Sequence, residues 1–153
     1  MKTPFIILAA LITLSTAAIA ASQNCPTSAK EISNKSRGKA TYFTYTSCLR
    51  EGTSGITASG KRLDDSAMWC ALPAWKMKIL RLKFGQRILV TNLHTGTSAI
   101  VKLMDRGPGR KSQAAGVVID LTAAAYRRLN GSRRQGHIHI EYRILTANAQ
   151  DPK

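Results

Sequence analysis

The sequence contains little negative charge. Its 153 residues include 8 Asp and Glu against 23 Lys and Arg, which gives a formal net charge of +15. Such a surplus favours an acidic polymer as the partner: nucleic acid, an anionic lipid surface, or a cell-wall glycan that carries carboxylates. A second interpretation is that the charge only keeps the protein soluble.

The chain also lacks the length for several domains. Chains usually divide only well beyond about 200 residues, so a length of 153 residues predicts one folded domain. A composition of 44% hydrophobic and 20% charged residues argues against disorder. Neither an internal repeat nor a nucleotide-binding motif occurs, and no cofactor is expected.

Long hydrophobic runs are absent except near the start of the chain. Lys2 precedes the apolar residues 5–12, and small residues then end in Ala18-Ile19-Ala20. The Ala-x-Ala pattern predicts a signal peptide cleaved after Ala20, and no other stretch is long and apolar enough to cross a membrane. We therefore expect an exported protein, periplasmic or extracellular, and export disfavours nucleic acid as the partner. The predicted segments are a signal peptide (1–20), a flexible tail (21–37), the folded domain (38–146) and a C-terminal tail (147–153).

Cysteine is scarce, with Cys25, Cys48 and Cys70 only. The three are widely spaced and form no CxxC pair, so no metal site is expected. In an oxidising compartment one disulfide is permitted, and Cys48 and Cys70 are the candidates because they bracket a Gly-rich loop.

Short β-type runs dominate the rest of the chain. Strands are predicted at 40–43, 87–93, 98–104, 116–120 and 137–144, with a hairpin turn at 94–97. Residues 63–84 mix two periods and contain Pro73, and we predict a short helical turn there. Thr122 is the expected N-cap of a helix over 123–129. Many short strands without βαβ alternation favour a mainly β fold, a small closed barrel.

The last predicted strand alternates strictly between two faces. Ile138, Ile140, Tyr142 and Ile144 share one face, which predicts burial. His137 and His139 share the other face with Glu141 and Arg143. We expect the two histidines to be exposed to solvent or to line a groove rather than to bind a metal with His94, because no clear third ligand exists.

Several segments in order carry a resemblance to a known family. They are Gly38-Lys39-Ala40-Thr41-Tyr42, Thr57-Ala58-Ser59-Gly60, residues 84–93, Gly96, Asp105-Arg106-Gly107-Pro108 and Ile119-Asp120-Leu121-Thr122. In this order they resemble the rare lipoprotein A-like (RlpA-like) double-psi β-barrel family, related more distantly to expansins and barwin-like domains. The resemblance implies a six-stranded double-psi β-barrel with one or two short helices and a polysaccharide-binding groove. Family members act on peptidoglycan as lytic transglycosylases, whereas expansin relatives loosen walls without hydrolysis.

The resemblance also implies the site residues. The family's key acid matches Asp105, a second groove acid matches Asp120, and the groove threonine matches Thr41, with Tyr42 beside it. The chain departs from the family at Lys61, where an acidic residue is usual. It also lacks the family's histidine, which aligns with Leu72 or Ile79, so an insertion is implied around residues 70–81.

One carboxyl group can carry out lytic transglycosylation, because the sugar's own 6-hydroxyl is the attacking group. Asp105, at the end of a strand, is the preferred acid and base, and Asp120 would raise its pKa as a like charge. Two structural alternatives stand beside these roles. Asp105 would fix its own turn through backbone N–H groups, and Asp120 would cap the following helix.

Two further groups of residues are candidates for binding. Trp69 and Trp75 would stack on sugars, although burial in the core is the preferred interpretation. A set of basic residues is expected to cluster around the Asp105 motif and attract wall carboxylates or phosphates. The set is Arg106, Arg110, Lys111, Arg127, Arg128, Arg133 and Arg134.

The sequence therefore predicts an exported, monomeric cell-wall protein that binds peptidoglycan glycan strands. The partner is peptidoglycan or a related acidic wall polysaccharide. Two interpretations of its chemistry remain: cleavage as a lytic transglycosylase through Asp105, or non-catalytic, expansin-like binding or loosening. A third interpretation is a basic defence protein that acts on foreign walls or membranes.

Overall fold

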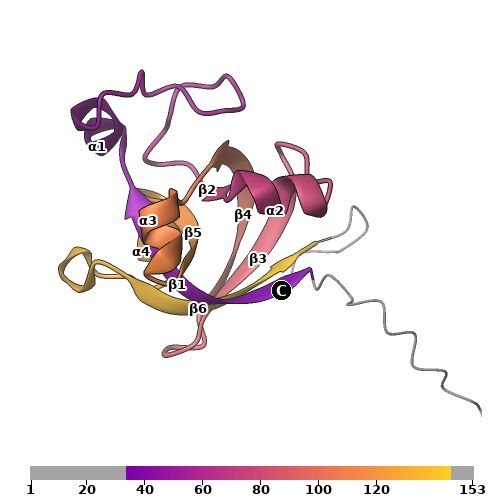
Figure 1. Ribbon diagram of the computed structural model, residues 1–153. Coiled ribbons are helices and arrows are strands. Elements are labelled where there is room, and N and C mark those ends of the chain that lie inside the picture. Colours follow the sequence, from indigo (N-terminus) through magenta and orange to yellow (C-terminus); the bar gives the residue numbers. More distant parts are fainter. Residues whose placement is uncertain (1–33, 146–153) are drawn as a thin grey trace, which may run out of the picture. The chain divides into compact units, whose positions relative to one another are not determined.

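Six strands close into a barrel in the part of the chain that the computed structural model describes, residues 34–145 (Figure 1). The order around the barrel is β1-β5-β2-β4-β3-β6. The pairs β1–β5 and β2–β4 are parallel and the other four pairs are antiparallel. The strands are β1 (Lys35–Phe43), β2 (Trp69–Leu72), β3 (Arg87–Asn92), β4 (Ser98–Arg106), β5 (Val117–Thr122) and β6 (Ile138–Ile144). The mainly β, six-stranded barrel confirms the predicted fold class.

The predicted signal peptide, Cys25 and the C-terminal tail lie outside the described residues. The first strand begins at Lys35, so the last three residues that we assigned to the tail belong to the barrel. Within residues 34–145, no helix is long and apolar enough to span a bilayer.

The barrel interior is filled by alternate residues of each strand. In β6, Ile138, Ile140, Tyr142 and Ile144 are buried, as the sequence predicts, and His139 and Arg143 are exposed. The predicted β3–β4 hairpin is confirmed, with Thr91 opposite Ser98 at its turn end. Each large apolar side chain buried in this way contributes about 1.5–3 kcal/mol, so the interior pattern determines which strand faces point outward.

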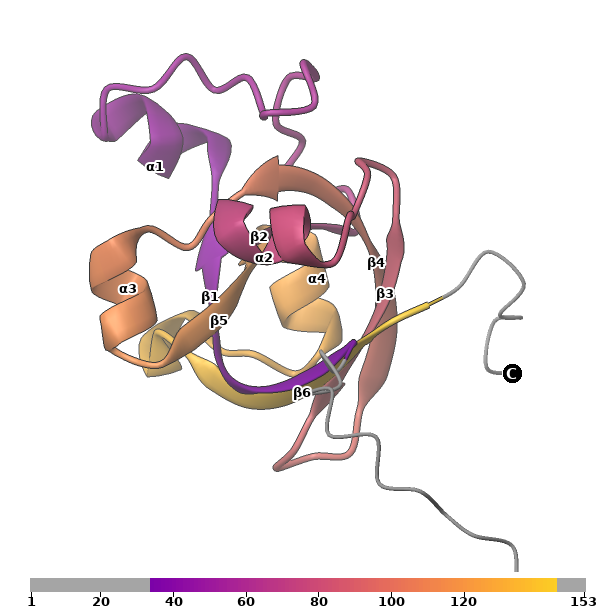
Figure 2. The same ribbon diagram turned by 45° about the vertical axis from the view of Figure 1, so that its right-hand side comes forward.

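Within residues 34–145, four short helices lie outside the barrel (Figure 2). They are α1 (Tyr45–Arg50), α2 (Ala74–Ile79), α3 (Arg110–Ala114) and α4 (Ala123–Arg128), and one 3₁₀ turn covers Arg133–Gln135. The helical turn predicted within 63–84 is α2, which begins directly after Pro73 because proline is tolerated at a helix start. The predicted α4 is confirmed, whereas α1 and α3 were not predicted.

The predicted position of Thr122 at the N-cap of α4 is confirmed, but the capping hydrogen bond of its side chain is not formed. The hydroxyl is buried, and it donates to the carbonyl of Ala67 at 2.5 Å and accepts from the backbone N–H of Trp69 at 3.3 Å. A buried hydroxyl needs a hydrogen-bond partner. The backbone of the neighbouring segment provides it, so the hydroxyl does not bond to the first turn of α4.

The segment between α1 and β2 is fixed on the aromatic ring of Tyr45. A Cβ at Gly55 would stand 2.3 Å from the ring, and Gly55 has φ +68°, so only glycine allows this approach. The guanidinium of Arg62 lies 4.6 Å from the same ring, and the backbone N–H of Tyr45 donates to Asp65 at 2.8 Å. These contacts hold the segment at one end of the barrel, where Figure 1 shows it.

Candidate functional site

Four residues from four neighbouring strands form one lateral row on the outer face of the barrel. Thr41 of β1 is the register partner of Asp120 in β5, and Asp120 is the partner of Ala71 in β2. Ala71 is in turn the partner of Asp105 in β4. Residues opposite one another across adjacent strands point to the same face of a sheet. The two aspartates therefore lie on either side of the small side chain of Ala71.

Two register shifts bring this row together. The β2–β4 register shifts between Cys70 and Ala71, so Ala71 pairs with Asp105 instead of Met104. The β1–β5 register shifts between Lys39 and Ala40 and aligns Thr41 with Asp120. Shifts of this kind re-aim side chains and are common next to binding sites.

The two aspartates line one hollow of about 310 Å³ together with Glu51. Three of the chain's 8 acidic residues therefore gather at one place on a protein of net charge +15. The rest of the lining comes from α1, the segment that follows it, and the end of β4. It comprises Phe43, Cys48, Thr53, Gly55, Ile56, Thr57, Leu63, Ala71, Arg106, Gly107 and Gly109.

The surroundings of Asp120 favour the protonated form of its carboxyl group. Burial raises the pKa of its carboxyl, the hydrogen bond from the Thr41 hydroxyl opposes the rise, and the negative charges of Glu51 and Asp105 add to it. Its second oxygen lies against Gly107, where a Cβ would stand 3.0 Å away. The predicted helix-capping role of Asp120 is wrong, because Thr122 occupies the N-cap of α4. A raised pKa keeps a carboxylic acid protonated at higher pH, as general acid catalysis requires.

Asp105 combines a structural role with a place in the hollow. Its Oδ1 accepts hydrogen bonds from the backbone N–H groups of Ala58 and Arg106, both at 2.8 Å. These bonds fasten the turn at 57–60 onto the end of β4 and hold the carboxyl group in one orientation. No hydrogen bond among the described residues uses Oδ2, so this oxygen is available to a ligand.

The other predicted binding residues divide between several places. Arg106 is exposed and lines the hollow, and its guanidinium lies 5.9 Å from the ring of Phe84. Tyr42 points the other way from Thr41 along β1, packs on Tyr126 with ring centroids 4.9 Å apart, and does not line the hollow. Its predicted groove position is wrong, because alternation along a strand sends neighbours to opposite faces.

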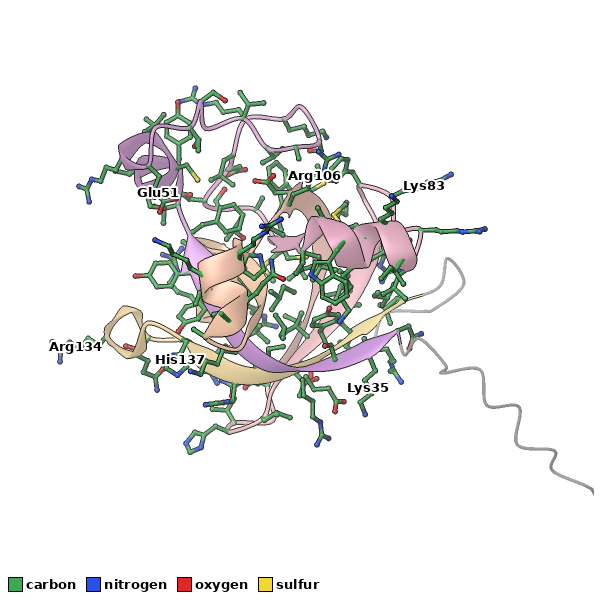
Figure 3. All side chains as sticks on the ribbon, in the orientation of Figure 1. Lys35, Glu51, Lys83, Arg106, Arg134 and His137 are labelled. Atoms are coloured by element: carbon green, nitrogen blue, oxygen red, sulfur yellow. The ribbon has the colours of Figure 1, made fainter. Side chains whose placement is uncertain are left out.

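His137 and His139 lie in a separate hollow. Both line a space of about 300 Å³ with His94, and this space shares no lining residue with the Asp105–Asp120 hollow. Figure 3 shows His137 at the lower left and Arg106 at the top of the view. Both histidines are exposed, which is one of the two predicted alternatives. As substrate-binding residues they do not lie with Asp105, because β6 is separated from β5 by β1 in the barrel. Among the described residues no His, Cys, Asp or Glu cluster could hold a metal.

The predicted disulfide between Cys48 and Cys70 is not formed, and both cysteines are free thiols. Cys70 is fully buried inside the barrel, whereas Cys48 lies on α1 and lines the hollow. Burial raises the pKa of both thiols. Strand alternation directs Cys70 inward, away from the loop that the two cysteines bracket.

Sequence reasoning missed Glu51 and misjudged Trp75. Glu51 ends α1 as its C-cap, directly before Gly52, and nothing in its neighbourhood distinguishes it from a solvated loop residue. Trp75 is 55% exposed on α2, although burial was the preferred interpretation. Its indole N–H donates to Gln113 at 2.8 Å, and Gln113 donates to the carbonyl of Pro108 at 2.7 Å. These two bonds hold an exposed aromatic surface beside the Asp105–Pro108 motif.

The basic residues that were predicted to cluster around the motif divide between two places. Arg106 lines the hollow, and Arg110 and Lys111 follow the motif directly at the start of α3. Arg127 and Arg128 lie on α4, and Arg134 lies in the 3₁₀ turn. The later members of the set do not line the hollow, because they follow β5, on α4 and in the 3₁₀ turn.

Comparisons with known proteins agree with the barrel and with part of the sequence. No protein-family model matches the chain. Over 71 residues, 46% of this chain, the sequence is 41% identical to the probable endolytic peptidoglycan transglycosylase RlpA of Synechocystis sp.. It is 40% identical over 71 residues to the protein of the same description from Nostoc sp.. The matched segment makes up 19% and 16% of the lengths of these two relatives.

Solved structures share the fold at low sequence identity. The expansin of Clavibacter michiganensis superposes with a TM-score of 0.53 and 22% identity over 76% of this chain and 52% of that chain. A mutant of that expansin in complex with cellohexaose gives a TM-score of 0.52 and 20% identity, over 76% of this chain and 53% of that one. The Streptomyces papain inhibitor gives a TM-score of 0.51 and 22% identity, over 73% of this chain and 94% of that chain. The resemblance predicted from the sequence is thus confirmed: the chain has the barrel fold of expansin and is partly homologous to RlpA-type transglycosylases.

Proposed function

We propose that this protein binds the glycan strands of peptidoglycan in the Asp105–Asp120 hollow and cleaves them by lytic transglycosylation. The observation that carries the proposal is the environment of Asp120. Its carboxyl has a raised pKa and lines an open hollow with two other carboxylates, one of them across Ala71. The partial homology to probable peptidoglycan transglycosylases supports the choice of substrate.

In the proposed reaction Asp120 is first an acid and then a base. Its proton passes to the glycosidic oxygen as the bond between that oxygen and the anomeric carbon breaks. The resulting carboxylate then takes the proton of the sugar's own 6-hydroxyl as this oxygen bonds to the same anomeric carbon. The products are an anhydro sugar and a new chain end, and no water is consumed. Asp105, held by two backbone N–H groups, offers a carboxylate to the positive charge that develops on the sugar ring.

This assignment reverses the roles that the sequence favoured for the two aspartates. Asp105 was the expected acid, but one of its oxygens is engaged by two backbone amides. Asp120 combines burial, two like charges and a hydroxyl donor that fixes its orientation. Burial and like charges are the two effects that keep a carboxylic acid protonated.

Action on peptidoglycan requires export, and we include it in the proposal. The Ala18-Ile19-Ala20 pattern after an apolar run supports cleavage of a signal peptide. The mature protein would keep a strong positive charge, which attracts it to the acidic cell wall.

The test is incubation of the purified mature protein with peptidoglycan sacculi, followed by mass analysis for anhydro-muropeptides. We expect Asp120→Asn to lower product formation by about 10²–10⁴-fold, the usual contribution of a general acid. Asp64→Asn is the matched control, because Asp64 is exposed, bonds to Ser66 and does not line the hollow. Equal activity of the parent protein and Asp120→Asn would refute the role of Asp120.

The second candidate is non-catalytic, expansin-like binding of the same strands. The hydrogen bonds from the backbone of Ala58 and Arg106 to Asp105 favour this candidate, because they give the carboxyl group a structural role in holding the turn at 57–60. In this case the parent protein would bind sacculi and release no anhydro product. Loss of binding in Asp105→Ala and Asp120→Ala would then identify the hollow as a glycan-binding site without catalytic activity.

A further inference from the structure

We infer that the outer face of β1, β6, β3 and β4 is a surface that binds anionic phospholipid membranes. These four strands are neighbours in the barrel, in the order β1-β6-β3-β4. Figure 2 shows β6 along the bottom of the barrel and β3 and β4 at its right. The side chains that carry this inference do not line the Asp105–Asp120 hollow, so it is independent of glycan cleavage.

One row of register partners crosses all four strands. Lys35 of β1 is the partner of Arg143 in β6, and Arg143 is the partner of Leu89 in β3. Leu89 is in turn the partner of Ile100 in β4. Partners on adjacent strands point to the same face of a sheet. The row therefore places two cations beside two apolar side chains on the outside of the barrel.

The neighbouring rows add further cations to this face. Arg37 of β1 is the partner of Glu141 in β6, and Arg87 of β3 is the partner of Lys102 in β4. Lys39 lies opposite the exposed His139. We call the resulting surface the basic face. Its cations are Lys35, Arg37, Lys39, Arg87, Lys102 and Arg143.

The charge of the basic face is poorly balanced by the protein itself. Glu141 is the one acidic residue among the residues that these three strand pairs align. Its carboxylate lies 2.9 Å from Nζ of Lys35 and 2.5 Å from Nε of Arg37. Six cations thus stand against one carboxylate. Like charges directly opposite each other destabilise a sheet, and Arg87 opposite Lys102 is such a pair. An anionic ligand would reduce this repulsion.

The layout of the cations favours an extended surface as the ligand over a single polymer chain. Three interstrand spacings of about 4.8 Å separate β1 from β4, or about 14 Å across the strands. The four residue steps from Lys35 to Lys39 span about 13 Å along β1. The cations are therefore spread in two directions. The headgroup phosphates of a bilayer are spread in the same way, whereas one polymer chain follows a single track.

Apolar side chains accompany the cations. Leu89 and Ile100 are half-buried partners at the centre of the face. Leu93 directly follows β3, its N–H donates to the carbonyl of His139 at 2.9 Å, and its side chain is 47% exposed. Binding at a membrane interface combines burial of apolar area with attraction to anionic lipids. A soluble polyanion would satisfy only the charges.

The basic face and the Asp105–Asp120 hollow lie toward opposite ends of β1. Lys35 begins this strand, whereas Phe43, its last residue, lines the hollow. Figure 3 shows Lys35 at the bottom of the view and Glu51 and Arg106 at the top. A protein bound to a membrane through the basic face would therefore keep the hollow open to a second ligand.

The test is co-sedimentation of the purified mature protein with two kinds of vesicle. One kind contains phosphatidylcholine alone, and the other contains equal parts of phosphatidylcholine and phosphatidylglycerol. We expect binding to the anionic vesicles only, and weaker binding as salt is added, because salt screens exposed charges. Binding to both kinds of vesicle with equal affinity would overturn the inference.

A triple variant of the basic face tests which cations are responsible. The variant with Lys39→Gln, Lys102→Gln and Arg143→Gln leaves both ion pairs of Glu141 in place. It should bind anionic vesicles about 100-fold more weakly, because each Lys or Arg near such a membrane contributes about fivefold.

A matched control removes the same charge elsewhere. Arg110→Gln with Lys111→Gln and Arg128→Gln takes three exposed cations from α3 and α4 and should bind close to the parent affinity. Equal losses in the two triple variants would overturn the inference, because binding would then follow the net charge of the protein.

A single substitution separates a membrane from a soluble polyanion. Leu93→Ser should weaken binding to anionic vesicles by about fivefold, since roughly half of a leucine side chain would leave water at the membrane. Its binding to inorganic polyphosphate should equal that of the parent protein. If the parent protein binds polyphosphate and not the vesicles, the ligand is a phosphate polymer and the membrane assignment is overturned. None of these measurements involves peptidoglycan, so the proposed function is tested separately.

Discussion

Asp105 and Asp120 face each other across a single residue, because both are register partners of Ala71 in the strand between them. The small side chain of Ala71 leaves the space above it open, and a hollow of about 310 Å³ lies there. A larger residue at this position would separate the carboxyl groups from a ligand. The arrangement couples the two acids, since the charge of Asp105 raises the pKa of Asp120 along with burial and Glu51.

The pH dependence of activity should move in opposite directions in two variants. Activity that needs protonated Asp120 falls at high pH as this group loses its proton. Glu51→Gln removes a negative charge that raises the pKa of Asp120, so the high-pH limb should shift to lower pH. Thr41→Val removes a hydrogen bond that lowers the pKa of Asp120, so the limb should shift to higher pH. The rate of anhydro-muropeptide release, measured as a function of pH, gives the shift of the high-pH limb in each variant. Shifts in the same direction would contradict the assignment of Asp120 as the acid.

Stability should also depend on pH through Asp120. Its folded-state pKa is raised above the unfolded value of about 3.9, so the folded protein binds more protons between the two pKa values. The free energy of unfolding therefore decreases as the pH rises through this window. Asp120→Asn removes that decrease, and its Tm relative to the parent protein should rise with pH above about 4. Thermal unfolding at several pH values measures this difference, and parallel curves for the two proteins would contradict the expectation.

Trp75 should contribute to glycan affinity from its exposed position on α2. Aromatic pairs gain about 0.5–1.5 kcal/mol from ring contact, and for a sugar ring on the indole we expect a similar gain, so Trp75→Ala should weaken binding to glycan strands by about 2- to 12-fold. Gln113→Ala frees the indole from its hydrogen bond and should cause a smaller loss. Calorimetric titration with glycan strands gives both values. Ile79→Ala serves as the control on the same helix, since Ile79 is 51% exposed and is not aromatic.

The cysteines should react as free thiols with different accessibility. In the native protein Cys48 should be alkylated slowly, because burial raises its pKa, and Cys70 should react only after unfolding. Peptide mapping by mass spectrometry after timed alkylation distinguishes the two. Recovery of a Cys48–Cys70 disulfide peptide from the unreduced protein would show that the predicted bridge forms after all.

Local patterns in the sequence determined the elements and the interior of this protein. The alternation of Ile138, Ile140, Tyr142 and Ile144 predicted a strand and its buried face, and the structure confirms both. The runs at 87–93 and 98–104 predicted a hairpin because a turn with Gly96 joins them. Strand β2 was missed, because Trp69-Cys70-Ala71-Leu72 is short and shows no alternation.

The site was decided by contacts between strands that lie far apart in the sequence. Thr41, Ala71, Asp105 and Asp120 form a row only because two register shifts align four strands of the closed barrel. The same packing brings Glu51 to Asp120, gathers Lys78, Arg81 and Lys83 beside Arg106, and moves His137 and His139 to another hollow. The periodicity of the sequence determines which face of a strand a side chain occupies. Which side chains meet on that face depends on strand order and register. Strand order and register are set when all six strands pack their apolar side chains into the same barrel interior.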